Sequence, residues 1–145
     1  MPVNKTINNI KTIKSISKIA NKELAIIDLP SIDWHLSLKL ALGKIKLAKD
    51  LHAIMINNLP KEQALINLAF NQQKLDDLRE YIHKLHGGCC YTGFSKLKYI
   101  AKKLEQEIAV KHHNQINKNK IKQYIDLINQ EINFLITQQF QIQNL

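Results

Sequence analysis

The sequence is poor in the residues that build disulfide frameworks, nucleotide-binding loops and membrane spans. It contains two cysteines, four glycines and three prolines. The cysteines are the neighbours Cys89 and Cys90, whose side chains would diverge by roughly 100° on a helix, so a disulfide between them is disfavoured. No apolar run reaches the roughly 18 residues of a transmembrane helix, and the N-terminus lacks the compact apolar stretch of a signal peptide. We therefore expect a cytoplasmic protein without direct membrane insertion.

Arginine is scarce as well, although the chain is strongly basic. The 21 Lys and Arg residues outnumber 12 Asp and Glu, which gives a formal net charge of +9. Only one of these basic residues is an arginine, Arg79, and the lysines are spread from Lys5 to Lys122. Nucleic-acid recognition usually relies on clustered arginines with aromatic stacking partners. We therefore expect no nucleic-acid partner, whereas an acidic protein surface would be attracted to this chain.

Apolar residues recur at helical spacing over most of the chain, and no segment alternates with the period of two that a strand requires. The length of 145 residues is that of one ordinary domain. Pro30 marks a boundary. We expect residues 1–30 to form a leader or linker, at most partly helical, and residues 31–145 to form an antiparallel four-helix bundle with one or two short accessory helices.

Caps and apolar stripes mark the individual helices. Asp33 is placed to start a short helix that carries Trp34 into the core and stops at Gly43. Pro60 either kinks the second helix or opens a new one, and Ser95 is a candidate cap for a later helix. Residues 111–120 are expected to be a loop. Two stripes are especially regular: Leu97, Ile100, Ala101, Leu104 and Ile108, and then Ile121, Ile125, Ile128, Ile132 and Leu135.

The most unusual segment is residues 82–93, which holds two histidines, both cysteines and three of the four glycines. A glycine in a helix interior costs about 1 kcal/mol relative to alanine, so the pair Gly87 and Gly88 suggests that something approaches the backbone closely. Successive rotations of roughly 100° from His83 place a polar or small face beside it and an apolar stripe opposite. The members of the first are Asp76, Arg79, His86, Gly87 and Cys90, and those of the second are Leu75, Leu78, Tyr81, Ile82, Leu85 and Cys89.

His83 is therefore predicted to project outward as a candidate nucleophile. Gly87, four residues later, removes the side chain that would otherwise shield the imidazole. An unperturbed imidazole has a pKa of about 6.5 and is largely neutral near pH 7, as a nucleophile must be. Gly88 is rotated toward a neighbouring helix and is expected to allow close packing, while Cys89 is expected in the core and Cys90 at the surface.

These residues resemble the signature of histidine-containing phosphotransfer (HPt) domains. The resemblance is carried by His83-Lys84-Leu85-His86-Gly87-Gly88, then Gly93, Leu97 and Leu104-Glu105. It is greatest for the C-terminal HPt module of BarA-type hybrid sensor histidine kinases, in which Asp33-Trp34, Gly43-Lys44, Leu59-Pro60 and residues 83–93 have counterparts. The resemblance covers roughly residues 31–110 and does not include the leader.

The resemblance implies a phosphorelay intermediate of a two-component system. His83 would accept a phosphoryl group from a receiver-domain aspartate and pass it to another response-regulator receiver, downstream of a hybrid histidine kinase. Lys84, His86, Gly87, Arg79 and Cys90 would contact the phosphate or the receiver. Many family members have lysine where this chain has His86. Because the receiver would supply Mg²⁺, the chain itself is expected to need no cofactor, no metal and no ATP site.

Two other functions are compatible with the residues alone. His83, His86 and Cys90 share a face and are ligand types that Zn²⁺ accepts. The net charge also suits a basic helical adaptor or a nucleic-acid-binding bundle. The sequence leaves open whether the chain is a free-standing carrier or the terminal module of a kinase, which kinase and regulator it serves, and its oligomeric state.

Overall fold

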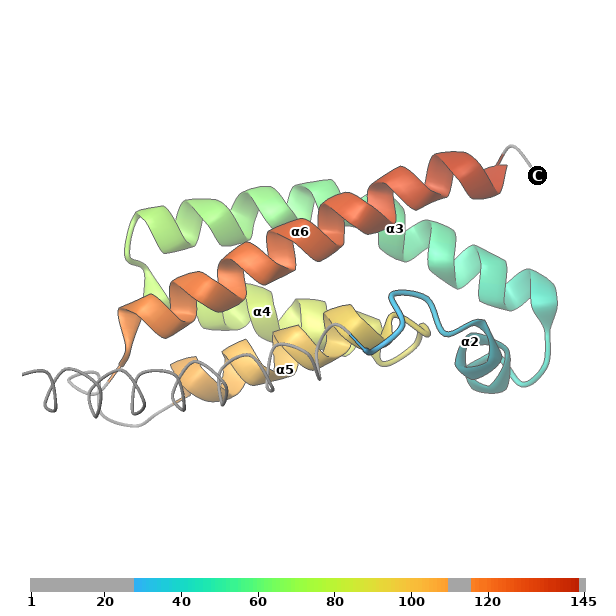
Figure 1. Ribbon diagram of the computed structural model, residues 1–145, viewed down its shortest axis with the longest axis horizontal. Helices are drawn as coiled ribbons and strands as arrows, with labels where there is room; N and C mark the ends of the chain where they lie inside the picture. Colours follow the sequence, from blue (N-terminus) through green and yellow to red (C-terminus); the bar gives the residue numbers. More distant parts are fainter. Residues whose placement is uncertain (1–27, 110–115, 144–145) are drawn as a thin grey trace, which may run out of the picture.

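The computed structural model describes residues 28–109 and 116–143. Within those ranges the chain forms five helices and no strand. A short helix is followed by four long ones (Figure 1): α2 (Trp34–Leu40), α3 (Ile45–Asn71), α4 (Leu75–Cys89), α5 (Ser95–Ile108) and α6 (Lys118–Gln143). The expected all-α bundle with a short accessory helix is confirmed. Of the expected leader, only residues 28–30 lie within the described chain.

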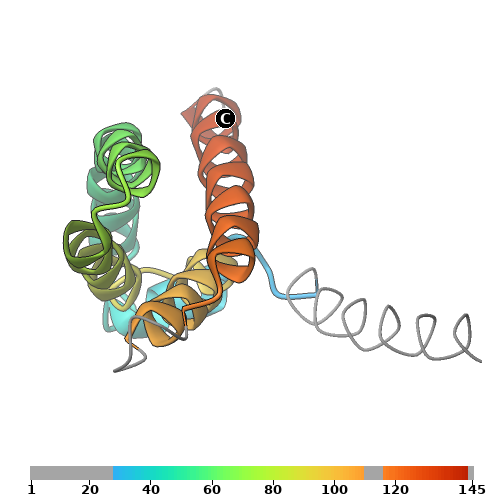
Figure 2. The same cartoon turned by 90° about the vertical axis from the view of Figure 1, so that its left-hand side faces the viewer.

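The four long helices form a closed ring. Each packs on the next in chain order, and α6 packs back on α3. Figure 2 looks along the four long helices. The ring encloses a core of aliphatic side chains that come from all four helices. Every member of the two regular stripes predicted for α5 and α6 is buried, from Leu97 to Ile108 and from Ile121 to Leu135. Burial of such a stripe is what stabilises an amphipathic helix in a bundle. None of the described helices is both long and apolar enough to cross a bilayer.

The short helix α2 is anchored to the loop between α4 and α5. The Asp33 carboxylate caps α2 by accepting a hydrogen bond from the Leu36 amide at 3.0 Å. The Asp33 amide donates to the Gly93 carbonyl at 2.7 Å, and the Gly93 amide donates to Ser37 Oγ at 3.0 Å. A Cβ on Gly93 would collide with the Asp33 carbonyl oxygen and with Ser37 Oγ. Glycine is therefore required at position 93 by the close approach of α2.

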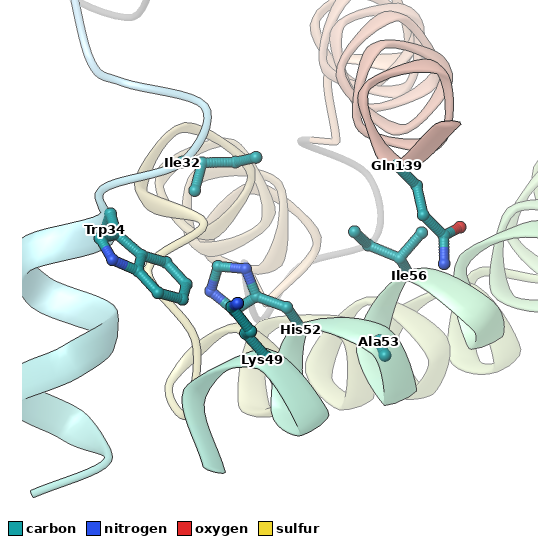
Figure 3. Close-up of a pocket in the computed structure, with 7 residues that line it drawn as sticks. All are labelled: Ile32, Trp34, Lys49, His52, Ala53, Ile56 and Gln139. Atoms are coloured by element: carbon teal, nitrogen blue, oxygen red, sulfur yellow. The ribbon is translucent and has the colours of Figure 1, made fainter. Parts of the chain in front are cut away.

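A buried histidine that the sequence did not reveal completes this contact. His52 of α3 is 8% exposed, and its Nε2 lies 2.7 Å from Ser37 Oγ. Its ring packs edge-on to Trp34 (Figure 3). The same ring is tilted against Phe94. Burial lowers the pKa of His52, because the charged imidazolium is poorly solvated there. The neutral ring thus serves as a packing element beside a cavity of about 600 Å³.

Side-chain amides join α3 to α6 along one seam of the ring. Asn67 and Asn129 exchange two hydrogen bonds, at 3.1 and 2.9 Å. Gln63 Nε2 donates to Asn129 Oδ1 at 3.0 Å and to Asn133 Oδ1 at 3.1 Å. These four residues are called the amide seam below. Because paired amides satisfy each other's donors and acceptors, the seam holds a polar contact between two helices without a charge.

Several expectations for individual residues and element bounds are wrong. Trp34 is 38% exposed instead of lying in the core, because α2 packs on the bundle through Ser37 and Ala41. Ser95 is the first residue of α5 and makes no capping hydrogen bond; the cap position belongs to Phe94. Pro60 opens no new helix, because it lies inside α3. Residues 118–120 belong to α6 and not to a loop.

Gln73, just after the end of α3, has an unfavourable backbone conformation, which allows a test of stability. Gln73 has φ of 56°, in the left-handed region, and the Lys74 amide donates to the Ala69 carbonyl in the pattern of a glycine-ended helix. Glycine adopts this conformation without steric cost. Gln73→Gly is therefore expected to raise the free energy of unfolding by about 0.5–1 kcal/mol.

Urea denaturation of Gln73→Gly measures this gain as a higher midpoint with an unchanged slope. Gln72→Gly is the matched control. Gln72 has φ of −85°, so glycine there only adds freedom to the unfolded chain and should lower stability. Equal shifts in both variants would contradict the assignment of strain to Gln73.

Candidate functional site

The helix α4 presents its two faces as the sequence predicted. Leu78, Ile82, Leu85 and Cys89 are completely buried. On the other face the His83 side chain is 74% exposed. Two acidic residues, Asp76 and Asp77, lie in the first turn, where they interact favourably with the helix dipole. The imidazole is thus held on the outside of a helix whose opposite face is fixed in the core.

A carboxylate from the neighbouring helix reaches His83. Glu105 of α5 places Oε1 at 2.5 Å from His83 Nδ1 and Oε2 at 3.1 Å from His86 Nδ1. The side chains of Glu105 and His86 are both 22% exposed, so this contact is partly shielded from water. One carboxylate therefore bridges two imidazoles that lie one turn apart on α4. Sequence reasoning included Glu105 in the family motif but gave it no role.

The bridge determines which nitrogen of His83 is free. An ionised carboxylate only accepts hydrogen bonds, so each Nδ1 that faces Glu105 carries the proton. The lone pair of His83 is then on Nε2, the ring nitrogen on the far side from Glu105. A carboxylate that holds one imidazole nitrogen also fixes the ring orientation. In the neutral imidazole the proton is therefore on Nδ1 and the lone pair on Nε2, in a side chain that is 74% exposed.

The two adjacent glycines of α4 have different surroundings. A Cβ at Gly87 would meet nothing within 4 Å, so the space beside His83 is open. A Cβ at Gly88 would lie 3.0 Å from Sδ of Met55, on α3, so this glycine allows close helix packing. A partner surface can therefore approach the backbone of α4 at Gly87 without displacing any described residue.

The remaining predicted site residues lie on α4 or directly after it. Arg79 lies one turn before His83 and is exposed, and His86 lies within the carboxylate bridge. Cys90 is exposed, but its Sγ lies 3.4 Å from the His86 carbonyl oxygen, to which it donates. Burial strongly raises the pKa of the neighbouring Cys89 thiol, which stays protonated in the core.

The positive charge of Lys84 acts on a carboxyl group of α3. Burial raises the pKa of Glu62 on α3, and the positive charge of Lys84 partly opposes that rise. Glu62 Oε2 is buried and makes no hydrogen bond. Lys84 therefore helps to balance a poorly solvated carboxyl group on the neighbouring helix, beside its expected part in attracting a partner.

The geometry does not favour the zinc alternative. Among residues 28–109 and 116–143, no group of three or more His, Cys, Asp and Glu side chains could hold a metal ion. The ligand set that was considered, His83, His86 and Cys90, is divided, because the imidazoles turn to Glu105 and the thiol turns to its own helix. His112 and His113 lie outside the described residues.

Comparisons with known proteins identify the family of the chain. The family model described as the Hpt domain matches residues 50–133. The signal transduction histidine-protein kinase BarA of Escherichia coli (strain K12) is 32% identical over 78 residues, which cover 54% of this chain and 8% of that protein. The sensor protein GacS of Pseudomonas syringae pv. syringae is 34% identical over 74 residues, which cover 51% of this chain and 8% of that protein.

A solved structure supports the fold. The crystal structure of the HPT domain from a sensor hybrid histidine kinase of Shewanella matches with a TM-score of 0.69 and 24% identity, over 79% of this chain and 95% of that one. An outward histidine on a helical bundle defines the class of module, and the family model covers more than half of the chain. The chain belongs to the Hpt domain family, whose members carry out histidine phosphotransfer in two-component phosphorelays.

Proposed function

We propose that His83 is the phospho-acceptor of this chain, which takes a phosphoryl group from the aspartate of one receiver domain and passes it to another. The observation that carries the proposal is the 74% exposed imidazole whose Nδ1 is held by Glu105. Exposure lets the phosphorylated aspartate of a receiver reach Nε2. The fixed Nδ1–H keeps Nε2 available as the nucleophile.

In the proposed transfer no proton has to leave the site. His83 Nε2 attacks phosphorus, the N–P bond forms, and the P–O bond to the receiver aspartate breaks and releases a carboxylate. The ring becomes positively charged because Nδ1 keeps its proton, and the Glu105 carboxylate lies against that proton. A charge that develops during the reaction is thus met by a group that is already in place. The reverse sequence returns the phosphoryl group to a second receiver.

The partner proteins would supply the cofactors of the reaction. We assign the divalent cation of the transfer, Mg²⁺, to the receiver, and the ATP-dependent step to an upstream hybrid histidine kinase. The relatives matched here are sensor kinases, of which the matched region is 8%. Arg79 and Lys84 flank His83 and would attract the acidic face of a receiver and offset the phosphoryl charge. Gly87 provides the open space for that contact, and Cys90 lies at its edge.

Label transfer tests the proposal. The full chain is mixed with a receiver domain that carries a radiolabelled phosphoryl group on its aspartate, with Mg²⁺ present. We expect the label to move to this chain and to show the stability of phosphohistidine, which survives alkali and is lost in acid. A panel of receivers that transfers no label, or a label that is lost in alkali like an acyl phosphate, would overturn it.

Glu105 gives a second test of the same site. Glu105→Gln keeps the shape of the side chain but removes the charge that faces Nδ1 of His83. We expect the rate constant of transfer to fall about 10- to 100-fold, because partners that orient an imidazole typically contribute that much. Single-turnover transfer from a phosphorylated receiver measures the change.

Glu107→Gln is the matched control, since Glu107 lies on the same helix and pairs with Lys120 at 3.3 Å, away from the histidines. It should transfer at the wild-type rate. Nitrogen NMR of the imidazole distinguishes orientation from general damage, because only Glu105→Gln should disturb the Nδ1–H form of His83. Equal rates in Glu105→Gln and the wild type would show that the carboxylate has no part in transfer.

A further inference from the structure

The segment of residues 34–49, called the α2–α3 corner below, combines positive charge with exposed apolar side chains. It contains no Asp or Glu, although it lies between Asp33 and Asp50. It contains four lysines, Lys39, Lys44, Lys46 and Lys49, all of them exposed. The corner is therefore a purely basic stretch next to the bundle.

Large apolar side chains are also exposed at this corner. Nine large hydrophobic residues are exposed in the described chain, and five belong to this segment: Trp34, Leu40, Leu42, Ile45 and Leu47. Leu42 is the most exposed of all nine, at 83%. Contiguous exposed apolar residues usually mark a surface that binds something. Here they alternate with lysines.

A tight turn places Leu42, the apolar tip of the corner, at the surface. Leu42 has φ of 57° and Gly43 has φ of 77°, and together they make the tight turn between α2 and α3. The Gly43 amide donates to the Leu38 carbonyl at 2.7 Å, which closes the end of α2. Leucine at φ of 57° is unfavourable, since left-handed positions normally hold glycine or asparagine. The turn lies at one extremity of the molecule (Figure 1), and Trp34 and Lys49 stand on its bundle side, at the cavity (Figure 3).

We propose that the α2–α3 corner binds to the surface of an anionic lipid bilayer, with Leu42 and Ile45 inserted among the lipids and the lysines against the headgroups. A convex apolar tip needs no matching hollow in a bilayer, which deforms around it. Lysines near an anionic membrane gain electrostatic energy that adds to the burial of apolar area. A second copy of this chain is a poor occupant, because two corners would bring four lysines against four.

This binding would leave the phosphotransfer site accessible. His83 lies in the middle of α4. The corner, which includes the first turn of α3, lies at the end of the molecule (Figure 1). The proposal rests only on the exposed residues and charges of the corner. It stands or falls independently of the function proposed for His83.

Vesicle sedimentation with the full chain tests the proposal. The probes are vesicles of phosphatidylcholine alone and vesicles with one third phosphatidylglycerol. We expect binding to the anionic vesicles, little binding to the neutral ones, and loss of binding at about 0.5 M salt, where surface charges are screened. The single tryptophan, Trp34, lies in the corner, so its emission should shift to the blue on binding.

Two variants separate the apolar from the electrostatic part. Leu42→Asn/Ile45→Ser removes the tip, and asparagine suits the left-handed turn, so the fold is kept. Lys44→Gln/Lys46→Gln removes two charges. Each should weaken binding to the anionic vesicles by about tenfold or more. The matched controls, Leu68→Ser on α3 and Lys118→Gln/Lys122→Gln on α6, should bind within about twofold of the wild type.

Three results would overturn the proposal. The wild type fails to bind the anionic vesicles at low salt; the corner variants bind as well as the controls, which would place any binding elsewhere in the chain; or neutral vesicles bind equally well. Binding of the corner to an acidic polypeptide such as polyglutamate, without binding to the anionic vesicles, would likewise assign the surface to a protein partner instead.

Discussion

Phosphoryl transfer to the His83→Gln variant is expected to fall more than about 1,000-fold, below detection in a gel assay, because the variant lacks the nucleophile itself. Glutamine has no basic lone pair that can form the N–P bond. The side chain at position 83 is 74% exposed, so the substitution should change the free energy of unfolding by no more than about 0.5 kcal/mol. Label transfer and urea denaturation on the same preparation measure both quantities.

His35→Gln is the matched control for this experiment. His35 is an exposed histidine on α2, away from Glu105, and its variant should accept the phosphoryl group at the wild-type rate. His86→Gln should lose only the second hydrogen bond to Glu105 and should slow transfer several-fold. Labelling of His83→Gln at the wild-type rate would place the acceptor on another residue.

Replacing Gly93 with alanine should have the largest effect on stability. The new Cβ would fall on the Asp33 carbonyl oxygen and on Ser37 Oγ, which are parts of a hydrogen-bonded contact and not flexible ends. Either α2 leaves the α4–α5 loop or the loop is distorted. We expect a loss of about 3 kcal/mol or more in the free energy of unfolding, as for overpacking at a rigid site.

Gly87→Ala should have the opposite effect on the free energy of unfolding. Its Cβ would meet nothing within 4 Å, and alanine favours the helix over glycine by about 1 kcal/mol, so stability should rise. Thermal or urea unfolding of the two variants gives the comparison. Similar stabilities for Gly93→Ala and the wild type would mean that α2 does not hold the loop as the structure describes.

The parts of the site that lie on one helix could be predicted from the sequence, and the parts that depend on two helices could not. The rotation of 100° per residue places His83 opposite Leu78 and Ile82 whatever surrounds the helix. Glu105 meets His83 only because α4 and α5 pack in one particular register, which no local pattern encodes. A carboxylate at position 105 is visible in the sequence, but its distance from position 83 is not.

The errors at the start of the bundle have a related cause. Trp34 looks like a core residue because large apolar side chains are usually buried. A short helix such as α2 has little area to bury, and it docks through the small residues Ser37 and Ala41. His52 was missed for the opposite reason, because a buried imidazole needs Ser37, Trp34 and Phe94 around it, and these come from α2 and from the α4–α5 loop, both distant from His52 in the sequence.

The amide seam between α3 and α6 limits how this module can move. Sliding α6 by one turn, about 5.4 Å along its axis, would separate Asn67 from Asn129 and break the two hydrogen bonds between them. A piston-like displacement of these two helices is therefore costly. In the proposed phosphotransfer the bundle would therefore act as a rigid support for His83. The signal would be the presence of the phosphoryl group and not a change of shape.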